Sequence, residues 1–234
     1  MSKLYLDAGT TWSKIIQIKN NDKPVFDNNF IVKETENRWY YIVPSKNLNS
    51  KNYQWQSVTG HMSVETKQSG AMYTNEVIAL AKGAQKLNLP DKDYIILDLG
   101  SRDVKWVRFE DNKFKDLDWN SSCASSTGAT VEMLLKFYDL TVYDLKFNKE
   151  KYNITCGIFG LEKIMDDIAK GENTGNAISK FVHGVAFNAW SFANKPQFVY
   201  LSGGFCENGC FVKSLSQYAK VEKLGRFVLA EGLI

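Results

Sequence analysis

Two apolar segments of the chain each end in an aspartate that is followed two residues later by a glycine. LYLDAGTT carries Asp7 and Gly9, and ILDLGSRD carries Asp98 and Gly100. Glycine lets a backbone turn approach a phosphate without a Cβ clash and tolerates positive φ. Aspartate does not bind phosphate directly, because both are anions, but it can hold a hydrated Mg²⁺. The two turns therefore predict one magnesium–phosphate site to which both halves of the chain contribute.

A third turn, in VYLSGGFCENG, places Gly203 and Gly204 after another apolar run. Glycines there leave room for an adenosine that a side chain would block. Hydroxyl, amide and ammonium groups beside the aspartates would serve as phosphate donors. Those expected to do so are Thr10, Thr11, Lys14 and Lys105. The chain has neither Gly-x-x-x-x-Gly-Lys-[Ser/Thr] nor Gly-x-Gly-x-x-Gly, which excludes a P-loop and disfavours a dinucleotide-binding fold.

Two cysteines lie at or just before predicted helices, Cys123 in WNSSCASSTG and Cys156 in YNITCGIFG. A helix N-terminus lowers the pKa of a thiol, and its amides can hydrogen-bond the sulfides of an iron–sulfur cluster. A 4Fe-4S cluster takes four thiolates, so a two-fold dimer would supply two from each chain. The spacing alone leaves open that both are small buried hydrophobic residues. Cys206 and Cys210 share one helix face and are interpreted as core residues.

Apolar periodicity predicts the elements that position these residues. Strand patterns cover 3–8, 12–19, 24–33, 54–60, 94–101, 103–110, 114–119, 152–157 and 197–204. Helical patterns cover 73–87, with Thr74 or Asn75 as the cap, then 126–139, 158–170, 174–194 and the stretch from the third turn to about 219. Residues 34–52 are polar and are predicted as loop with a short helix. Because strand–turn–strand–turn–strand plus helices occurs twice, we predict a duplicated α/β fold with lobes at 1–92 and 93–234.

Composition limits the classes of function. The chain has 234 residues, 44% of them hydrophobic, and a formal net charge of +3 from 29 basic and 26 acidic residues. The basic residues are scattered, so nucleic acid is not an expected partner. No apolar run reaches the ~20 residues that span a membrane. A start without signal-peptide layout favours a cytoplasmic protein, in which four cysteines indicate ligation, catalysis or burial.

Together these motifs resemble the ATP-dependent activators of 2-hydroxyacyl-CoA dehydratases and benzoyl-CoA reductases, the BadF/BadG/BcrA/BcrD ATPase family. The resemblance runs from about residue 3 to the C-terminus and is weakest at 20–55. Its most specific element is the ordered pair Cys123 and Cys156 in their contexts. The segments that carry it are LYLDAGTTWSKI, SVTGHMS, TNEVIALAKGA, LDLGSRDVK, NSSCASSTGATVEML, CGIFGLEKIMDDIAKGE, ISKFVHGVA and LSGGFCEN.

The resemblance implies a two-lobed, actin-like (RNase H-like) α/β fold, shared with acetate and sugar kinases, with ATP or ADP and Mg²⁺ in the crevice between the lobes. It implies an ATPase that drives a low-potential electron through a 4Fe-4S cluster shared by a homodimer. An upstream donor would reduce the cluster, and a dehydratase- or reductase-like iron–sulfur enzyme would accept the electron. The catalytic residues would be Asp7, Asp98 and Asp103, and the cluster ligands Cys123 and Cys156. The nucleotide would contact Gly9, Thr10, Thr11, Lys14, Gly100, Ser101, Thr127, Gly128, Gly203, Gly204 and Asn208.

Two departures from the family pattern keep other functions open. The second turn reads Gly100-Ser101-Arg102-Asp103 where the family has Gly-Gly-Gln-Asp, and Ser126 replaces a glycine. An arginine near the γ-phosphate could stabilise transition-state charge or hold nucleotide without turnover. The alternatives are a small-molecule kinase of the same fold, with Asp103 as its base, and a non-hydrolysing, nucleotide-gated interaction protein.

Overall fold

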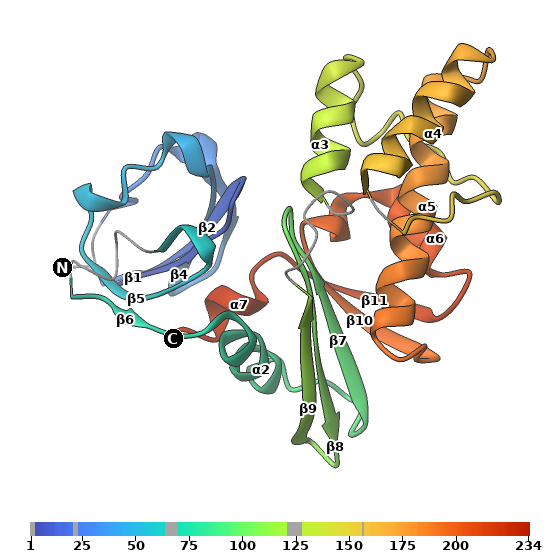
Figure 1. The fold of residues 1–234 in the computed structure, drawn as a ribbon. Coiled ribbons are helices and arrows are strands. Elements are labelled where there is room, and N and C mark those ends of the chain that lie inside the picture. The colour runs from blue at the N-terminus through green and yellow to red at the C-terminus, as the bar shows by residue number, and fades with distance from the viewer. Residues whose placement is uncertain (1–2, 21–22, 64–69, 121–127, 156) are drawn as a thin grey trace. The chain divides into compact units, whose positions relative to one another are not determined.

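The computed structural model describes residues 3–20, 23–63, 70–120, 128–155 and 157–234 (Figure 1). The chain divides into two compact units. Unit 1 comprises Met1–Pro90 together with Arg226–Ile234, and unit 2 comprises Asp91–Gly225. The sequence assigned residues 226–234 to the second lobe, whereas the structure packs them with the first.

Unit 1 is built on a six-stranded sheet with the order β3-β4-β2-β1-β5-β6. Strand β1 is buried along its whole length, which explains its unbroken apolar sequence up to Asp7. It pairs antiparallel with β2 and parallel with β5. The strands are β1 (Leu4–Ala8), β2 (Trp12–Ile18), β3 (Ile31–Glu34), β4 (Arg38–Pro44), β5 (Trp55–Thr59) and β6 (Met72–Tyr73).

Strand β4 corrects the first part of the sequence prediction of loop and short helix over 34–52, whereas the 3-10 helices Ser45–Asn47 and Ser50–Asn52 agree with that prediction. The β4 residues RWYYIVP are largely buried, and they pair with both β2 and β3. Aromatic and β-branched residues favour such a strand, but polar neighbours on both sides diluted the pattern. The expected third strand near 24–33 contains instead a 3-10 turn, Asn28–Phe30, and the short edge strand β3.

Among the described residues of unit 1, two α-helices accompany the sheet. Helix α2 (Glu76–Lys86) begins after Asn75, whose side chain accepts a hydrogen bond from Val77 N at 3.0 Å, as the cap prediction required. Helix α7 (Val228–Glu231) comes from the end of the chain. Glu231 binds Arg38 Nη1 at 2.6 Å and accepts from Tyr40 OH at 2.7 Å. These contacts hold the C-terminal segment on β4.

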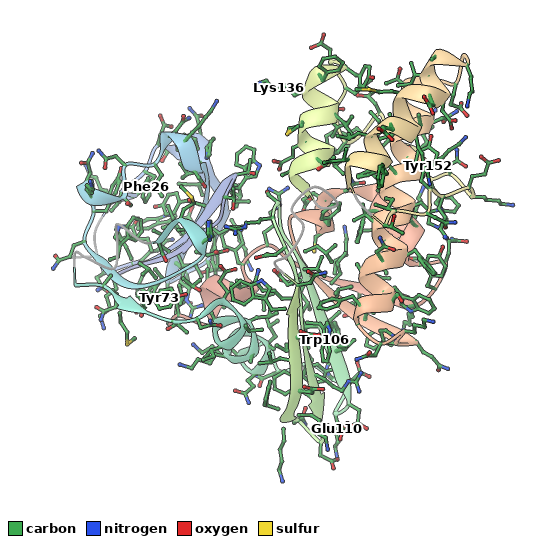
Figure 2. The ribbon with its side chains drawn as sticks, in the orientation of Figure 1. Phe26, Tyr73, Trp106, Glu110, Lys136 and Tyr152 are labelled. Atoms are coloured by element: carbon green, nitrogen blue, oxygen red, sulfur yellow. The ribbon has the colours of Figure 1, made fainter. Side chains whose placement is uncertain are left out.

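Unit 2 repeats the hairpin of unit 1 in a five-stranded sheet with the order β11-β10-β7-β8-β9. Strands β7, β8 and β9 form an antiparallel meander, and β10 pairs parallel with β7 and β11. Figure 2 labels Trp106 and Glu110 on β8. The strands are β7 (Tyr94–Leu99), β8 (Val104–Glu110), β9 (Lys113–Asn120), β10 (Phe198–Gly203) and β11 (Lys220–Gly225).

In the described part of unit 2, four α-helices pack with this sheet around a hydrophobic core. They are α3 (Gly128–Phe137), α4 (Gly157–Ala169), α5 (Thr174–Phe192) and α6 (Gly209–Leu215). The strand predicted at 152–157 is not formed over Tyr152–Thr155. Helix α5 binds this backbone instead, since Tyr152 N donates to Lys180 O at 3.1 Å and Asn188 Nδ2 donates to Ile154 O at 2.8 Å. Within the described ranges, no helix is both long and apolar enough to cross a membrane.

Candidate nucleotide-binding site

The first turn joins β1 to β2 and holds Asp7 opposite Lys14. Lys14 Nζ lies 3.0 Å from Asp7 Oδ2, and both side chains are largely buried. Gly9 N donates to Asp7 O at 3.1 Å, and a Cβ on Gly9 would meet Trp12 O at 2.5 Å. The turn is therefore too tight for a side chain at Gly9 because of the Trp12 backbone, whereas the sequence argument gave the approach of a phosphate as the reason for glycine.

Ser45, which was not predicted from the sequence, forms two hydrogen bonds to the backbone of this turn. Its hydroxyl donates to Gly9 O at 2.7 Å and its amide to Thr11 O at 2.9 Å. Thr10 is exposed and Thr11 is half-buried, so their hydroxyls lie near the surface of the turn. Ser45 reaches the turn only because β4 pairs with β2. No local signal at Ser45 could have revealed it.

In unit 2 the end of β7 meets the end of β10. Ser202 Oγ donates to Asp98 Oδ1 at 2.6 Å, and both residues are buried. Gly203 has φ of +93°, and a Cβ there would collide with Leu99 O. Gly204 is exposed, with no heavy atom within 4 Å of where its Cβ would be. Gly203 is thus needed for the close approach of two strands, and Gly204 leaves the surface open to a ligand.

Asp103 closes the second turn and lies in a buried ion pair. Its Oδ1 is 2.6 Å from Lys105 Nζ, and its Oδ2 accepts from Trp119 Nε1 at 3.0 Å. Asp103 and Lys105 are 6% and 2% exposed. Gly100 N donates to Asp103 O at 3.1 Å, which fixes the width of the turn. A carboxylate held by two donors in this way is suited to shaping the turn.

Two further predicted nucleotide contacts, Gly128 and Asn208, lie at the starts of helices. Gly128 is the first residue of α3 and is packed on Gly100 and Ser101. Asn208 caps α6, with its side chain accepting from Phe211 N at 3.0 Å, and it is buried. Thr127 falls outside the described residues, as do Cys123 and Cys156.

The described cysteines do not form a metal site. Cys206 Sγ donates to Leu201 O at 3.2 Å, and Cys210 Sγ donates to Lys146 O at 3.6 Å. Burial raises the pKa of Cys206 to about 12 and also raises that of Cys210, which disfavours the thiolate that a metal requires. In the part of the chain that the structure describes, no three His, Cys, Asp or Glu side chains gather as a metal site.

Both hairpins place an aspartate and a lysine directly opposite each other. The register pairs Asp7 with Lys14 in unit 1 and Asp98 with Lys105 in unit 2. Each aspartate also lies beside a parallel strand, since Asp7 is paired with Thr59 and Asp98 with Ser202. Ligands of α/β folds bind at the carboxyl ends of such strands. The two units therefore repeat one geometry at the ends of their buried strands.

No family model matches the chain. One curated relative is the (R)-2-hydroxyglutaryl-CoA dehydratase activating ATPase of Acidaminococcus fermentans, 22% identical over 147 residues. The match covers 57% of this chain and 56% of the relative, so the chain matches only about half the length of that protein.

Two solved structures resemble the whole chain. The activator of the 2-hydroxyisocaproyl-CoA dehydratase from Clostridium difficile, with bound ADPNP, has a TM-score of 0.74 at 18% identity and covers 100% of this chain and 92% of its own. Component A of the A. fermentans (R)-2-hydroxyglutaryl-CoA dehydratase has a TM-score of 0.74 at 19% identity, covering 100% and 96%. The chain is similar to the activators of 2-hydroxyacyl-CoA dehydratases. This confirms the resemblance that the motifs indicated and the actin-like α/β fold.

Proposed function

We propose that the chain is an ATP-hydrolysing iron–sulfur activator that delivers low-potential electrons to a dehydratase- or reductase-like enzyme. The observation that carries this proposal is the repeated aspartate–lysine hairpin, Asp7 with Lys14 and Asp98 with Lys105, at the ends of buried strands. The similarity to dehydratase activators, one of them with bound ADPNP, supports the same assignment.

In this proposal Asp7 and Asp98 hold Mg²⁺ and order the attacking water. Both carboxylates are already oriented by a neighbour, Asp7 by Lys14 and Asp98 by Ser202. Preset orientation lowers the entropic cost of assembling the reactants. Carboxylates are the protein ligands that a hydrated Mg²⁺ prefers. The phosphate contacts assigned here are Gly9, Thr10, Thr11, Lys14, Gly100 and Ser101.

The adenosine would lie against the turn after β10. Gly204 is exposed and unobstructed, so a base or ribose can approach its backbone. Gly203 keeps that turn close to Asp98, because its positive φ redirects the chain beside Leu99. The adenosine contacts assigned here are Thr127, Gly128, Gly203, Gly204 and Asn208.

Cys123 and Cys156 are assigned as ligands of a 4Fe-4S cluster completed by the same two residues of a second copy of the chain. The buried thiols Cys206 and Cys210 do not fit that role, which leaves the other two. Helix α4 begins directly after Cys156, and α3 begins five residues after Cys123. A bound cluster supplies one-electron transfer at low potential. The partners in this proposal are an upstream electron donor and an iron–sulfur acceptor enzyme, and the compartment is the cytoplasm.

Asp103 is the residue that a kinase of this fold would use as its base. Its carboxylate is instead bonded to Lys105 and Trp119 in the sheet. Both of its oxygens are thus engaged by side chains of the sheet, so neither is placed to take a proton from a substrate hydroxyl. Asp103 is therefore proposed to shape the ATPase turn, and the geometry disfavours the kinase alternative.

Iron and sulfide analysis of anaerobically purified protein tests the electron-transfer part of this proposal. We expect about four irons per dimer, lost in Cys123→Ser and Cys156→Ser but kept in Cys210→Ala. A colourless monomer after anaerobic reconstitution would refute the shared cluster.

Calorimetry with Mg-ADPNP and an ATPase assay test the nucleotide site separately. Asp98→Asn should lose hydrolysis, whereas the exposed Asp111→Asn should not. If the wild type binds Mg-ADPNP but does not hydrolyse ATP, the result would favour the nucleotide-gated interaction protein.

A further inference from the structure

Two buried hydroxyls on β5 have no hydrogen-bond partner within the described residues. They are Ser57 Oγ and Thr59 Oγ1, and both residues are 0% exposed. A buried donor that is left without a partner costs the desolvation free energy of that group, so each of these hydroxyls requires an explanation. A bound water or ligand that reaches the hydroxyl provides the missing partner.

Thr59 differs from Ser57 in its place along the strand. Thr59 is the last residue of β5 and is paired with Asp7 of β1. Ser57 is paired with Tyr5, two positions earlier on both strands. Paired residues of neighbouring strands lie about 4.8 Å apart and point to the same face of the sheet. Of the two hydroxyls, that of Thr59 therefore lies beside Asp7, at the end of the sheet where the first turn begins.

Asp7 lies between a lysine and this hydroxyl. Lys14 of β2 is paired with Asp7 from one side, and its Nζ lies 3.0 Å from Asp7 Oδ2. Thr59 is paired with Asp7 from the other side, but within the described residues its hydroxyl has no direct bond to the carboxylate. A hydroxyl donates one hydrogen bond and accepts two, so a water between Thr59 and Asp7 can bond to both side chains.

The turn after Thr59 keeps this hydroxyl in place. Gly60 has φ of +95°, and a Cβ there would lie 2.5 Å from Ala8 O. Ser63 closes the turn, because its Oγ donates to Gly60 O at 2.7 Å and its amide donates to the same oxygen at 3.2 Å. The end of β5 is therefore in close backbone contact with the residue that follows Asp7, and a displacement of Thr59 from the carboxylate would break these contacts.

We propose that the Thr59 hydroxyl hydrogen-bonds the attacking water that Asp7 orders, which makes Thr59 a further residue of the ATPase site. The inference rests on the proposed function, because it requires the role given there to Asp7. The water oxygen bonds to the terminal phosphorus as the bond from that phosphorus to the ADP oxygen breaks. One proton of the water stays on the phosphate product and the other passes to solvent. Thr59 exchanges no proton and fixes only the direction of the water, which lowers the entropic cost of the attack.

ATP hydrolysis by Thr59→Val tests this role, because valine has the shape of threonine without the hydroxyl. We expect kcat to fall about tenfold or more, whereas KM for Mg-ATP and the calorimetric affinity for Mg-ADPNP stay within about twofold of the wild type. Thr59→Ser restores the hydroxyl and should recover most of kcat. Ser57→Ala removes the other buried hydroxyl and, as the matched control, should keep the wild-type kcat.

Urea unfolding of the nucleotide-free protein separates this role from a structural one. A buried hydroxyl without a protein partner does not stabilise the fold, so Thr59→Val and Ser57→Ala should both keep or raise the urea midpoint. A hydroxyl with a purely structural role would give the opposite pattern in Thr59→Val, a lower midpoint with unchanged kcat.

Each outcome decides the inference. Wild-type kcat in Thr59→Val would overturn it while leaving the proposed function intact. A tenfold weaker affinity of that variant for Mg-ADPNP would also overturn it, because the hydroxyl would then act in nucleotide binding. If the wild type does not hydrolyse ATP, the proposed function fails first and the role of Thr59 fails with it. If Thr59→Val does not fold, by circular dichroism, Thr59→Ala also lacks the hydroxyl and decides in the same comparison.

Discussion

Lys105 lies opposite Asp98 in the β7–β8 register, and its ammonium contacts Asp103, with Nζ 2.6 Å from Oδ1. In unit 1 the equivalent lysine, Lys14, contacts the strand-end aspartate Asp7 itself, at 3.0 Å. The duplicated hairpins thus share one residue pattern, and the second hairpin also has an ion pair to the aspartate inside its turn. The difference gives the second turn a charged brace, Asp103–Lys105, which links the turn to β8 and through Trp119 to β9.

Asp103→Asn should strongly destabilise the protein. It removes the carboxylate that lies 2.6 Å from the Lys105 ammonium, and Lys105 is only 2% exposed. Breaking a buried pair by removing one partner costs about 3–5 kcal/mol in free energy of unfolding. Urea unfolding followed by circular dichroism measures this loss.

Two variants control that measurement. Glu110→Gln breaks the exposed Glu110–Lys115 pair of the same sheet and should cost less than about 1 kcal/mol. The double variant Asp103→Asn/Lys105→Met removes both buried charges and should be more stable than Asp103→Asn alone. Equal stability of Asp103→Asn and Glu110→Gln would show that the Asp103–Lys105 pair does not contribute to the free energy of unfolding.

Local sequence patterns located the two aspartate–glycine turns because the determinants of these turns are local. A buried strand, an aspartate and a glycine adjoin each other at Asp7 and at Asp98, so an apolar run followed by a turn signal located both. The cap Asn75 was found for the same reason, since its partner Val77 is two residues away. Each of these features is specified within one short segment.

Features that depend on distant pairing were not predictable. Ser45 supports the first turn only through the pairing of β4 with β2. Glu231 binds Arg38 across 193 positions of the chain, so nothing near Glu231 in the sequence indicates where α7 packs. The irregular backbone of Tyr152–Thr155 likewise depends on donors and acceptors from α5.

Lys180→Met should reduce the loss of folding stability that acid causes. The hydrogen bond from Lys180 lowers the pKa of Glu172 below its usual value of 4.5. Hydrogen bonds from Tyr152 and, second, from Lys180 lower the pKa of Asp167 below its usual value of 3.8. Carboxyls with lowered pKa values contribute stability above those values and lose it as the pH falls through the folded-state pKa. The wild type should therefore lose more stability than Lys180→Met between about pH 5 and pH 3.

Urea unfolding at several pH values in this window measures that difference. Lys115→Met, which breaks the exposed Glu110–Lys115 pair, is the matched control and should keep the wild-type slope. An unchanged acid response in Lys180→Met would contradict the role given to Lys180.

Cys206 and Cys210 should resist alkylation in the folded protein. Burial raises the pKa of Cys206 to about 12 and raises that of Cys210, so little reactive thiolate exists at about pH 8. Iodoacetamide labelling followed by peptide mass spectrometry should find both unmodified in native protein and modified in guanidinium chloride. Labelling of native Cys206 at the rate of a free thiol would contradict the buried placement.

Gly83→Ala should loosen the C-terminal segment, because α2 and α7 cross in backbone contact at Gly83. A Cβ there would collide with Val228 O and lie 3.2 Å from Val228 Cγ1. Overpacking of this kind costs about 1–3 kcal/mol, and here it would push α7 from α2 and strain the bonds of Glu231 to Arg38 and Tyr40. We expect lower stability and faster trimming by carboxypeptidase.

Gly209→Ala, in open space at the start of α6, is the matched control and should change neither. A Gly83→Ala protein as stable and as resistant as Gly209→Ala would show that α7 does not depend on this crossing.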